Sequence, residues 1–513
     1  MNKTPASSAP AAPRAYALDA LRGFAILAML LSGQEPFGKL ALPAWMYHAQ
    51  EPPPDHEWLG HLPGITWVDL VFPFFLFCMG AAFPLALARR MDQGAAVGRL
   101  GRFILERGFL LGFFALYVQA IRPFTLSHHP DTGTWLLALL GFLLLFPVLT
   151  RLPEGWSAST QWLVRGAGWA GAILFLALAR YPDGSGFSLK RSDIIIVVLT
   201  NMAVFGSLIW MLTRHQWLPR LGVLGFVLAL RLSNMPEALG GWVTDLWKFS
   251  PLPWIYQLYY LQYLCIVIPG TIAGDMILQW IRAGATPGSA PGSAAGETEA
   301  WSAGRYATIA GLMLGLVLVL LAGLETRCPT DLPMTTPGVF LLNDQTWLRP
   351  WLLPATLLAF GLCGLGNWLL RGPGTAAERL YQKLFRWGTY WLVLGLFFEP
   401  YEGGIRKDHA TLSYYFVTAG LAHCVLIAFS ILIDRFQRRR WLQLLIDNGQ
   451  NPMIAYAGIN NFITPVLALS MLLDWSSVHA TTPWLGFLRG LTITLLMAVT
   501  VSWLTRRKIF WRT

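Results

Sequence analysis

The chain has 513 residues, of which 55% are hydrophobic and only 13% are charged, whereas soluble domains carry about 25% charged residues. This balance excludes an ordinary soluble protein and indicates a polytopic membrane protein. The net charge of +11 would suit nucleic acid in a soluble protein, but here the basic residues lie between apolar segments, where they set topology. We therefore expect a lipid bilayer as partner and no nucleic acid.

Apolar segments long enough to cross a bilayer recur along the whole chain, so the expected fold is an all-α transmembrane helical bundle of about 10 to 14 spans. The candidate spans are residues 20–32, 65–87, 103–121, 135–149, 162–178, 194–212, 218–230, 255–281, 309–324, 351–370, 390–398, 413–433, 453–473 and 485–504. Alternating these spans places about two-thirds of the lysines and arginines on one face, as the positive-inside rule expects. Both termini are then cytoplasmic, and the number of spans is even.

The segments outside the spans divide the chain into parts. Residues 1–14 are rich in Ala, Pro and Ser and lack the pattern of a signal peptide, so we interpret them as a disordered cytoplasmic lead. Residues 284–304 have the Ala, Gly, Pro and Ser composition of a cytoplasmic linker. This linker separates an N-terminal membrane half, residues 15–283, from a C-terminal half, residues 305–513. The outer loop 34–63 belongs to the first half.

The first predicted helix begins with two charged residues. Asp19 and Arg22 lie three residues apart and therefore on one face of the helix. This spacing permits an ion pair in the headgroup region. It equally permits an inward Arg22 that binds an anion such as a nucleotide phosphate.

A single carboxylate, Asp69, lies near the start of an apolar span. An ionised side chain in hydrocarbon costs at least about 2.5 kcal/mol, so such residues usually face the bundle interior or a water-filled cavity. The loop before this span holds His48, His56 and His61. Histidine is the usual general base, and a nearby carboxylate can orient its ring. The pattern predicts proton chemistry at the bilayer surface, while the alternative is that the three histidines are simply solvated.

Two polar stretches follow in the C-terminal half. Residues 399–415 form a charge-dense outer loop that runs into an apolar span, with Lys407 and Ser413 at its mouth. These two residues are our candidates for binding an acceptor substrate. Near a cytoplasmic helix entrance lie Asn451 and Tyr456, which either bind the polar end of a cofactor or belong to the helix cap.

The cysteines do not form a disulfide framework. Four of the five lie in apolar segments, and only Cys328 lies in an outer loop, so an intramolecular bridge is not expected. Neither Cys-x-x-Cys nor His-Glu-x-x-His occurs, and the loop histidines lack the spacing of a zinc site. We therefore predict no metal.

Four stretches resemble the transmembrane acyltransferases related to heparan-alpha-glucosaminide N-acetyltransferase, especially their bacterial, DUF5009-like homologues. They are LDALRG at 18–23, GITWVDLVFPFFLFCMG at 64–80, IRKDHATLSY at 405–414 and NGQNPMIAY at 448–456. The TxxDLVFP pattern in the second stretch is the specific one. The resemblance implies a multi-pass protein of the bacterial inner membrane. It would transfer acetyl from cytoplasmic acetyl-CoA to an amino sugar or another carbohydrate on the periplasmic side.

The resemblance also implies roles for individual residues. The family's catalytic histidine is followed by Ala and lies in the loop before the second stretch. His48 keeps that Ala if residues 51–60 are an insertion, whereas His61 is nearer to the expected spacing from Asp69 and is the second candidate. Asp69 would orient the histidine, and the candidates for contacts with acetyl-CoA are Arg22, Asn451 and Tyr456.

A proton-coupled sugar or glycan transporter is the alternative function, because it too is a polytopic bundle with an internal acid and a linker between halves. A catalytically silent partner in envelope glycan assembly is a third class. The lack of an obvious repeat between the two halves favours the enzyme over the carrier. The acceptor, N- versus O-acetylation, direct transfer versus an acetyl-histidine intermediate, and assembly as a homodimer all stay open.

Overall fold

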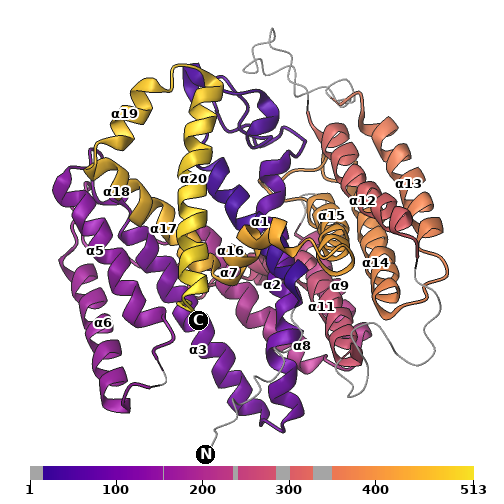
Figure 1. The fold of residues 1–513 in the computed structure, drawn as a ribbon, viewed down its shortest axis with the longest axis horizontal. Helices are drawn as coiled ribbons and strands as arrows, with labels where there is room; N and C mark the ends of the chain where they lie inside the picture. Colours follow the sequence, from indigo (N-terminus) through magenta and orange to yellow (C-terminus); the bar gives the residue numbers. More distant parts are fainter. Residues whose placement is uncertain (1–14, 154, 235–240, 285–300, 327–348, 513) are drawn as a thin grey trace, which may run out of the picture.

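The computed structural model describes residues 15–153, 155–234, 241–284, 301–326 and 349–512. These residues form a bundle of helices with two isolated β-bridges and no β-strand (Figure 1). The predicted lead 1–14 and residues 285–300 of the predicted linker lie outside the described residues. The expected all-α architecture is confirmed.

The first part of the chain contributes α1 (Tyr16–Ser32), η1 (Gly38–Leu40), η2 (Ala44–Met46), α2 (Trp67–Asp92), α3 (Val97–Ala120), α4 (Pro123–Leu126), α5 (Thr132–Leu149), α6 (Ala158–Leu178), α7 (Ile194–Asn201), η3 (Met202–Gly206), α8 (Ser207–Leu212), α9 (Trp217–Leu232), α10 (Trp242–Trp247), η4 (Leu258–Tyr263) and α11 (Leu264–Gly284). The second part contributes α12 (Ala303–Leu324), α13 (Leu352–Leu369), α14 (Ala376–Phe398), α15 (Leu412–Ser430), η6 (Ile431–Arg435), η7 (Arg439–Leu442), α16 (Gln443–Gln450), α17 (Pro452–Gly458), η8 (Ile459–Ile463), α18 (Thr464–Leu469), α19 (Leu472–His479) and α20 (Pro483–Arg506).

Eleven helical segments of the described chain are long and apolar enough to cross a membrane. They are Trp67–Asp92, Val97–Ala120, Thr132–Leu149, Ala158–Leu178, Ile194–Leu212, Leu258–Ala283, Ala303–Leu324, Leu352–Leu369, Leu412–Arg435, Pro452–Leu469 and Pro483–Arg506. The 17-residue α1 is also within the length range of about 17 to 25 residues for a spanning helix. The predicted multi-pass topology is therefore confirmed.

Both ends of the described chain lie at one end of the bundle, because both contact α16. Near the end of α20, Thr505 donates a hydrogen bond to the carbonyl oxygen of Asp447, at 3.1 Å. At the start of α1, the backbone of Asp19 packs against Gly449. This arrangement agrees with an even number of spans. We assign this arginine-rich end to the cytoplasm by the positive-inside rule.

One predicted span was too short. The prediction began at residue 390, whereas α14 begins at Ala376 with a capping box between Thr375 and Glu378. Arg379, Lys383 and Arg386 break the apolar run in the sequence. All three are exposed, and their spacing of four and three residues places them on one face of the helix. The opposite face of α14 packs into the bundle.

The cysteines match their predicted positions where they are described. Cys78, Cys265, Cys363 and Cys424 are buried and free. Cys328 lies outside the described residues.

A close backbone contact at this end of the bundle joins α1 to α16. A Cβ atom on Gly23 would lie 1.8 Å from the carbonyl oxygen of Leu445, and one on Gly449 would lie 1.8 Å from that of Asp19. Glycine is needed at both positions because a backbone carbonyl cannot move aside as a flexible side chain can. The two helices can therefore touch along their backbones.

We expect Gly23→Ala to lower the melting temperature of the detergent-purified protein, because overpacking of this kind costs about 1 to 3 kcal/mol. Gly101→Ala in α3 is the matched control, since a Cβ atom on Gly101 would meet nothing within 4 Å. Equal melting temperatures for the two variants would contradict the close α1–α16 contact.

Candidate functional site

The buried carboxylate of Asp69 caps its own helix. Asp69 is the third residue of α2, and Thr66 precedes the helix as N-cap in a capping box. The backbone N–H of Thr66 donates to Asp69 Oδ2 at 2.9 Å. A carboxylate at a helix N-terminus is also stabilised by the helix dipole. This local structure explains how an acid that is 0% exposed is accommodated in an apolar helix.

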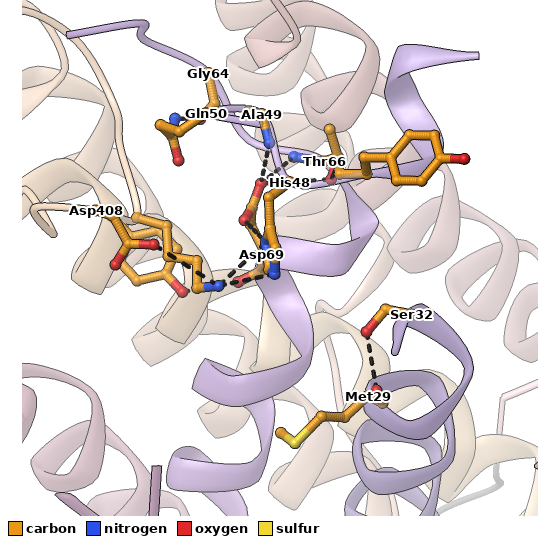
Figure 2. Close-up of polar contacts among 12 residues, drawn as sticks. Met29, Ser32, His48, Ala49, Gln50, Gly64, Thr66, Asp69 and Asp408 are labelled. Atoms are coloured by element: carbon orange, nitrogen blue, oxygen red, sulfur yellow. Dashed lines mark hydrogen bonds and ion pairs between the residues drawn. The ribbon is translucent and has the colours of Figure 1, made fainter. Parts of the chain in front are cut away.

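The outer loop brings His48 onto this carboxylate. His48 Nδ1 lies 2.6 Å from Asp69 Oδ1, and the N–H of Ala49 donates to Asp69 Oδ2 at 3.2 Å (Figure 2). The His48 side chain is 31% exposed, whereas that of Asp69 is 0% exposed. With the Nδ1 hydrogen directed at the carboxylate, Nε2 carries the lone pair. The pair therefore has the geometry of a carboxylate-oriented general base.

A second outer loop supplies a cation. Lys407, between α14 and α15, places its Nζ 3.1 Å from each ring nitrogen of His48. Two hydrogen bonds fix the two loops together: Gly64 N–H donates to Ile405 O at 2.6 Å, and Arg406 Nη1 donates to Gly60 O at 3.0 Å. His48 and Lys407, far apart in sequence, thus share one site.

Further contacts anchor the Lys407 loop to the bundle. Arg231, near the end of α9, pairs with Glu402 at 2.5 Å and donates to Ala410 O at 2.7 Å. The hydroxyl of Tyr414 in α15 donates to the carbonyl oxygen of Asp69 at 2.8 Å. The site is therefore anchored to α2, α9 and α15 rather than built on free loops alone. Arg231 and Glu402 could not be identified from the sequence, because only the fold brings them together.

The other two loop histidines lie apart from the carboxylate. His61 is exposed, and within the described chain the hydrogen bonds of the Asp69 side chain come from His48, Ala49 and Thr66. The ring of His56 packs against Tyr47, with centroids 4.5 Å apart. The structure therefore pairs Asp69 with the first of the two candidate histidines.

Ser413 differs from its expected position. It was predicted at the mouth of the outer loop, but it is 0% exposed, and its hydroxyl has no hydrogen-bond partner in the described part of the chain. The residue lies in the first turn of α15, which is buried almost along its whole length. Its burial removes it from the outer surface.

A cavity of about 630 Å³ lies between α1, α2, α3, α7 and α17. Most of its wall is apolar, and four arginines line it: Arg22, Arg90, Arg107 and Arg512. A cavity that combines apolar walls with clustered cations suits a long ligand with an anionic end. Arg90 and Arg107 belong to the basic residues between spans that the positive-inside rule assigns to the cytoplasm.

The cavity and the His48–Asp69 pair both lie along α2. Its wall includes Phe75 of α2, six residues beyond Asp69 and so about 9 Å along the helix axis. Arg22 donates to the carbonyl oxygen of Cys78 at 3.3 Å, a further three residues along α2. The arginine-lined end and the outer pair thus belong to one stretch of the bundle.

The three residues predicted to contact acetyl-CoA differ in their placement. Arg22 lines the cavity while remaining 3.8 Å from Asp19, so the ion pair and an inward position of Arg22 occur together. Tyr456 also lines it, and its hydroxyl donates to Asp193 at 2.7 Å. Asn451 does not line it. Its amide is held by the backbone of Ile509 and Trp511, so it positions the C-terminal segment.

No group of three or more His, Cys, Asp or Glu residues in the described parts of the chain is arranged to hold a metal ion.

A second buried acid, Glu35, lies in the outer loop directly after α1. It is 5% exposed, and its Oε1 has no hydrogen-bond partner among the described residues. Burial raises the pKa of Glu35 from its ordinary value of 4.5 to about 8. The folded protein therefore holds this proton at neutral pH, whereas the unfolded chain has lost it.

We expect thermal stability to fall as the pH rises from 5 to 8, by up to about 1.4 kcal/mol per pH unit from this group, because the folded state binds more protons than the unfolded state over that range. Glu35→Gln should remove this part of the pH dependence. Melting curves at several pH values test it, with Glu57→Gln, an exposed acid of the same loop, as control. The same slope in wild type and Glu35→Gln would show that Glu35 does not titrate in this way.

Comparison with known families gives a match that covers part of the chain. The family model described as "Domain of unknown function (DUF5009)" matches residues 14–277, which is just over half of the chain and includes His48, Asp69 and Arg22. No curated protein matches the chain. On the strength of the family match, the protein is a member of the DUF5009 family.

Proposed function

We propose that this protein is an acetyltransferase related to heparan-alpha-glucosaminide N-acetyltransferase. It moves acetyl from cytoplasmic acetyl-CoA to an amino sugar or another carbohydrate on the periplasmic side of the bacterial inner membrane. The observation that carries the proposal is the 2.6 Å contact of His48 with buried Asp69 above a cavity lined by four arginines. A general base and a site for an anionic donor then lie at different depths along the same helix, α2.

The residues of the outer site match the needs of acyl transfer. His48 Nε2 takes the proton of the acceptor amine or hydroxyl as that group attacks the thioester carbonyl. The new bond joins the acceptor atom to the acetyl carbon, the carbon–sulfur bond breaks, and the proton passes from His48 to the departing thiolate. Asp69 stabilises the imidazolium that forms in between. An acetyl-histidine route uses the same pair, with Nε2 as nucleophile.

Lys407 has a further part in this proposal. Its ammonium group lies 3.1 Å from Nε2 of His48 and donates to that nitrogen before substrate binds. During attack this donor turns to the carbonyl oxygen, on which negative charge develops, and Nε2 becomes free to take the acceptor proton. A fixed cation at that point lowers the energy of the transition state. The hydrogen bonds that hold the loop of Lys407 onto the loop of His48 keep this cation in place.

The cavity suits the donor. Guanidinium groups bind phosphate oxygens through paired, charge-assisted hydrogen bonds, and the cavity wall supplies Arg22, Arg90, Arg107 and Arg512. The apolar part of the wall, which includes Ile26, Met29, Phe75 and Met79, suits a pantetheine arm. The donor's phosphates would then lie at the cytoplasmic end, with the thioester toward His48.

The first test measures transfer of radiolabelled acetyl from acetyl-CoA to glucosamine and related sugars by the protein in detergent. His48→Ala and Asp69→Asn should each lower kcat at least about 100-fold, because each removes part of the general base. His61→Ala is the control and should leave the rate near that of wild type, since His61 is exposed and apart from Asp69.

The opposite results are equally informative. If no acceptor releases CoA and sealed proteoliposomes instead accumulate sugar under a proton gradient, the protein is a carrier, and the acetyltransferase proposal fails. If His61→Ala abolishes transfer while His48→Ala does not, the enzyme class stands and the assignment of the base is wrong.

The second test concerns the arginines. Arg22→Gln should raise KM for acetyl-CoA about tenfold, since charge-assisted hydrogen bonds are worth about 1.5 to 3 kcal/mol. The KM for acetyl-pantetheine, which lacks the nucleotide phosphates, should not change. Arg102→Gln is the control, because Arg102 is exposed and pairs with Glu106 at 2.8 Å outside the cavity. An equal rise in KM for both donors would show that Arg22 acts on folding rather than on phosphate.

A further inference from the structure

A second hollow lies far along the chain from the His48 site. It has a volume of about 520 Å³ and is lined by Arg305, Trp368, Leu369, Arg371 and Gly372. These residues come from the start of α12 and from the end of α13 with the turn that follows it. The turn leads into α14, at the end of the bundle that we assign to the cytoplasm. We call this hollow the α12–α13 groove.

One cation of the groove is held in a fixed position. Arg305 Nε donates to Leu369 O at 2.8 Å, and its Nη2 donates to Arg371 O at 2.5 Å. The guanidinium carbon also lies 4.4 Å above the ring centre of Trp301, whose indole N–H donates to Gly372 O at 3.1 Å. The positive-inside rule depends on the charge of an arginine and does not require a fixed orientation of its side chain. Arg305 is instead oriented by two backbone carbonyls and an aromatic ring.

The charge of the groove is not balanced by nearby acids in the described structure. Within the described ranges, neither Arg305 nor Arg371 forms an ion pair with a carboxylate. Glu378, at the start of α14, is 0% exposed. Its oxygens accept hydrogen bonds from Trp301, Tyr306, Gly374 and Thr375. Arg305 and Arg371 therefore line the groove, and in the described structure no carboxylate balances either charge.

The α13 side of the groove carries exposed apolar side chains that suit a membrane interface. Trp368 is 59% exposed and Leu365, nearly one turn earlier in α13, is 44% exposed. Exposed apolar side chains on a spanning helix contact lipid, and Trp favours the depth of the headgroups. The groove thus lies where Arg305 and Arg371 meet the lipid-facing side of α13.

We propose that the α12–α13 groove binds the headgroup of an anionic glycerophospholipid. Its phosphate is held by Arg305 and Arg371, because guanidinium groups match phosphate geometry, and its acyl chains lie along the exposed face of α13. Basic pockets between helices at the cytoplasmic face are known to suit such headgroups. Free phosphate shares the headgroup chemistry but makes no contact with α13, so it binds much more weakly. This proposal does not depend on the acetyltransferase function.

The test uses the delipidated full-length protein in neutral detergent. Binding of phosphatidylglycerol, phosphatidylcholine and inorganic phosphate is followed by native mass spectrometry and by melting temperature. We expect phosphatidylglycerol to bind and to raise the melting temperature, while the other two probes do neither at the same concentration. Arg371→Gln should weaken phosphatidylglycerol binding about fivefold, which is the contribution of one arginine near an anionic headgroup.

The controls separate binding from folding. Arg440→Gln removes an exposed arginine at the same end of the bundle but outside the groove, and it should bind phosphatidylglycerol as wild type does. Arg305→Gln should weaken binding as well, but it also removes two hydrogen bonds to the backbone, so the exposed Arg371 is the decisive variant. Equal binding of phosphatidylglycerol and phosphatidylcholine, unchanged binding by Arg371→Gln, or equal binding of inorganic phosphate would overturn the proposal.

Discussion

The buried carboxylate of Asp69 is the constraint on which the outer half of the structure depends. A carboxylate that is removed from water must accept hydrogen bonds from protein donors. Without them, it destabilises the fold by several kcal/mol. Here the donors come from Thr66 at the helix start and from His48 and Ala49 in the preceding loop. If the loop left the end of α2, the carboxylate would lose the donors of His48 and Ala49 and keep only that of Thr66. Satisfying this one acid fixes both the loop and the orientation of the histidine ring.

The same demand extends to the other half of the chain. Lys407 lies against His48, and its loop is tied down by the ion pairs of Glu402 with Arg231 and of Glu399 with Arg349. All four of these side chains are largely shielded from solvent, so each charge needs the other. Buried ion pairs of this kind contribute little net stability but define one arrangement. The outer site is thus assembled from two loops that are held by charge pairs, by hydrogen bonds between the loops and by buried apolar residues such as Ile405.

Hydropathy was sufficient to predict the fold class and most of the spans, because a spanning helix must be apolar whatever its neighbours are. The pairing of Asp69 with a loop histidine was also accessible, since an acid in an apolar run calls for a partner close by in sequence. The length of α14 was not, because its three exposed cations interrupt the apolar run that marks a span. For Ser413, the sequence could not reveal that the first turn of α15 is buried on all sides.

The cavity arginines show a different limit. Arg90 and Arg107 lie in positively charged segments that the positive-inside rule explains. The same residues also line the cavity. Only the arrangement of α1, α2, α3 and the C-terminal segment shows that both residues line a common space. Asn451 illustrates the reverse case: its amide looked available for a ligand, but the backbone of Ile509 and Trp511 uses it.

The contact between Gly23 of α1 and α16 sets an order for biogenesis. The ribosome delivers α1 to the membrane more than 400 residues before the chain reaches Leu445, so the two backbones meet only when synthesis is nearly complete. Until then, the face of α1 that carries Asp19 and Arg22 has none of its contacts with α16. A quality-control protease or an insertase that shields polar helix faces would therefore encounter α1 as an unfinished element through most of translation. Completion of the cavity is coupled to arrival of the last helices.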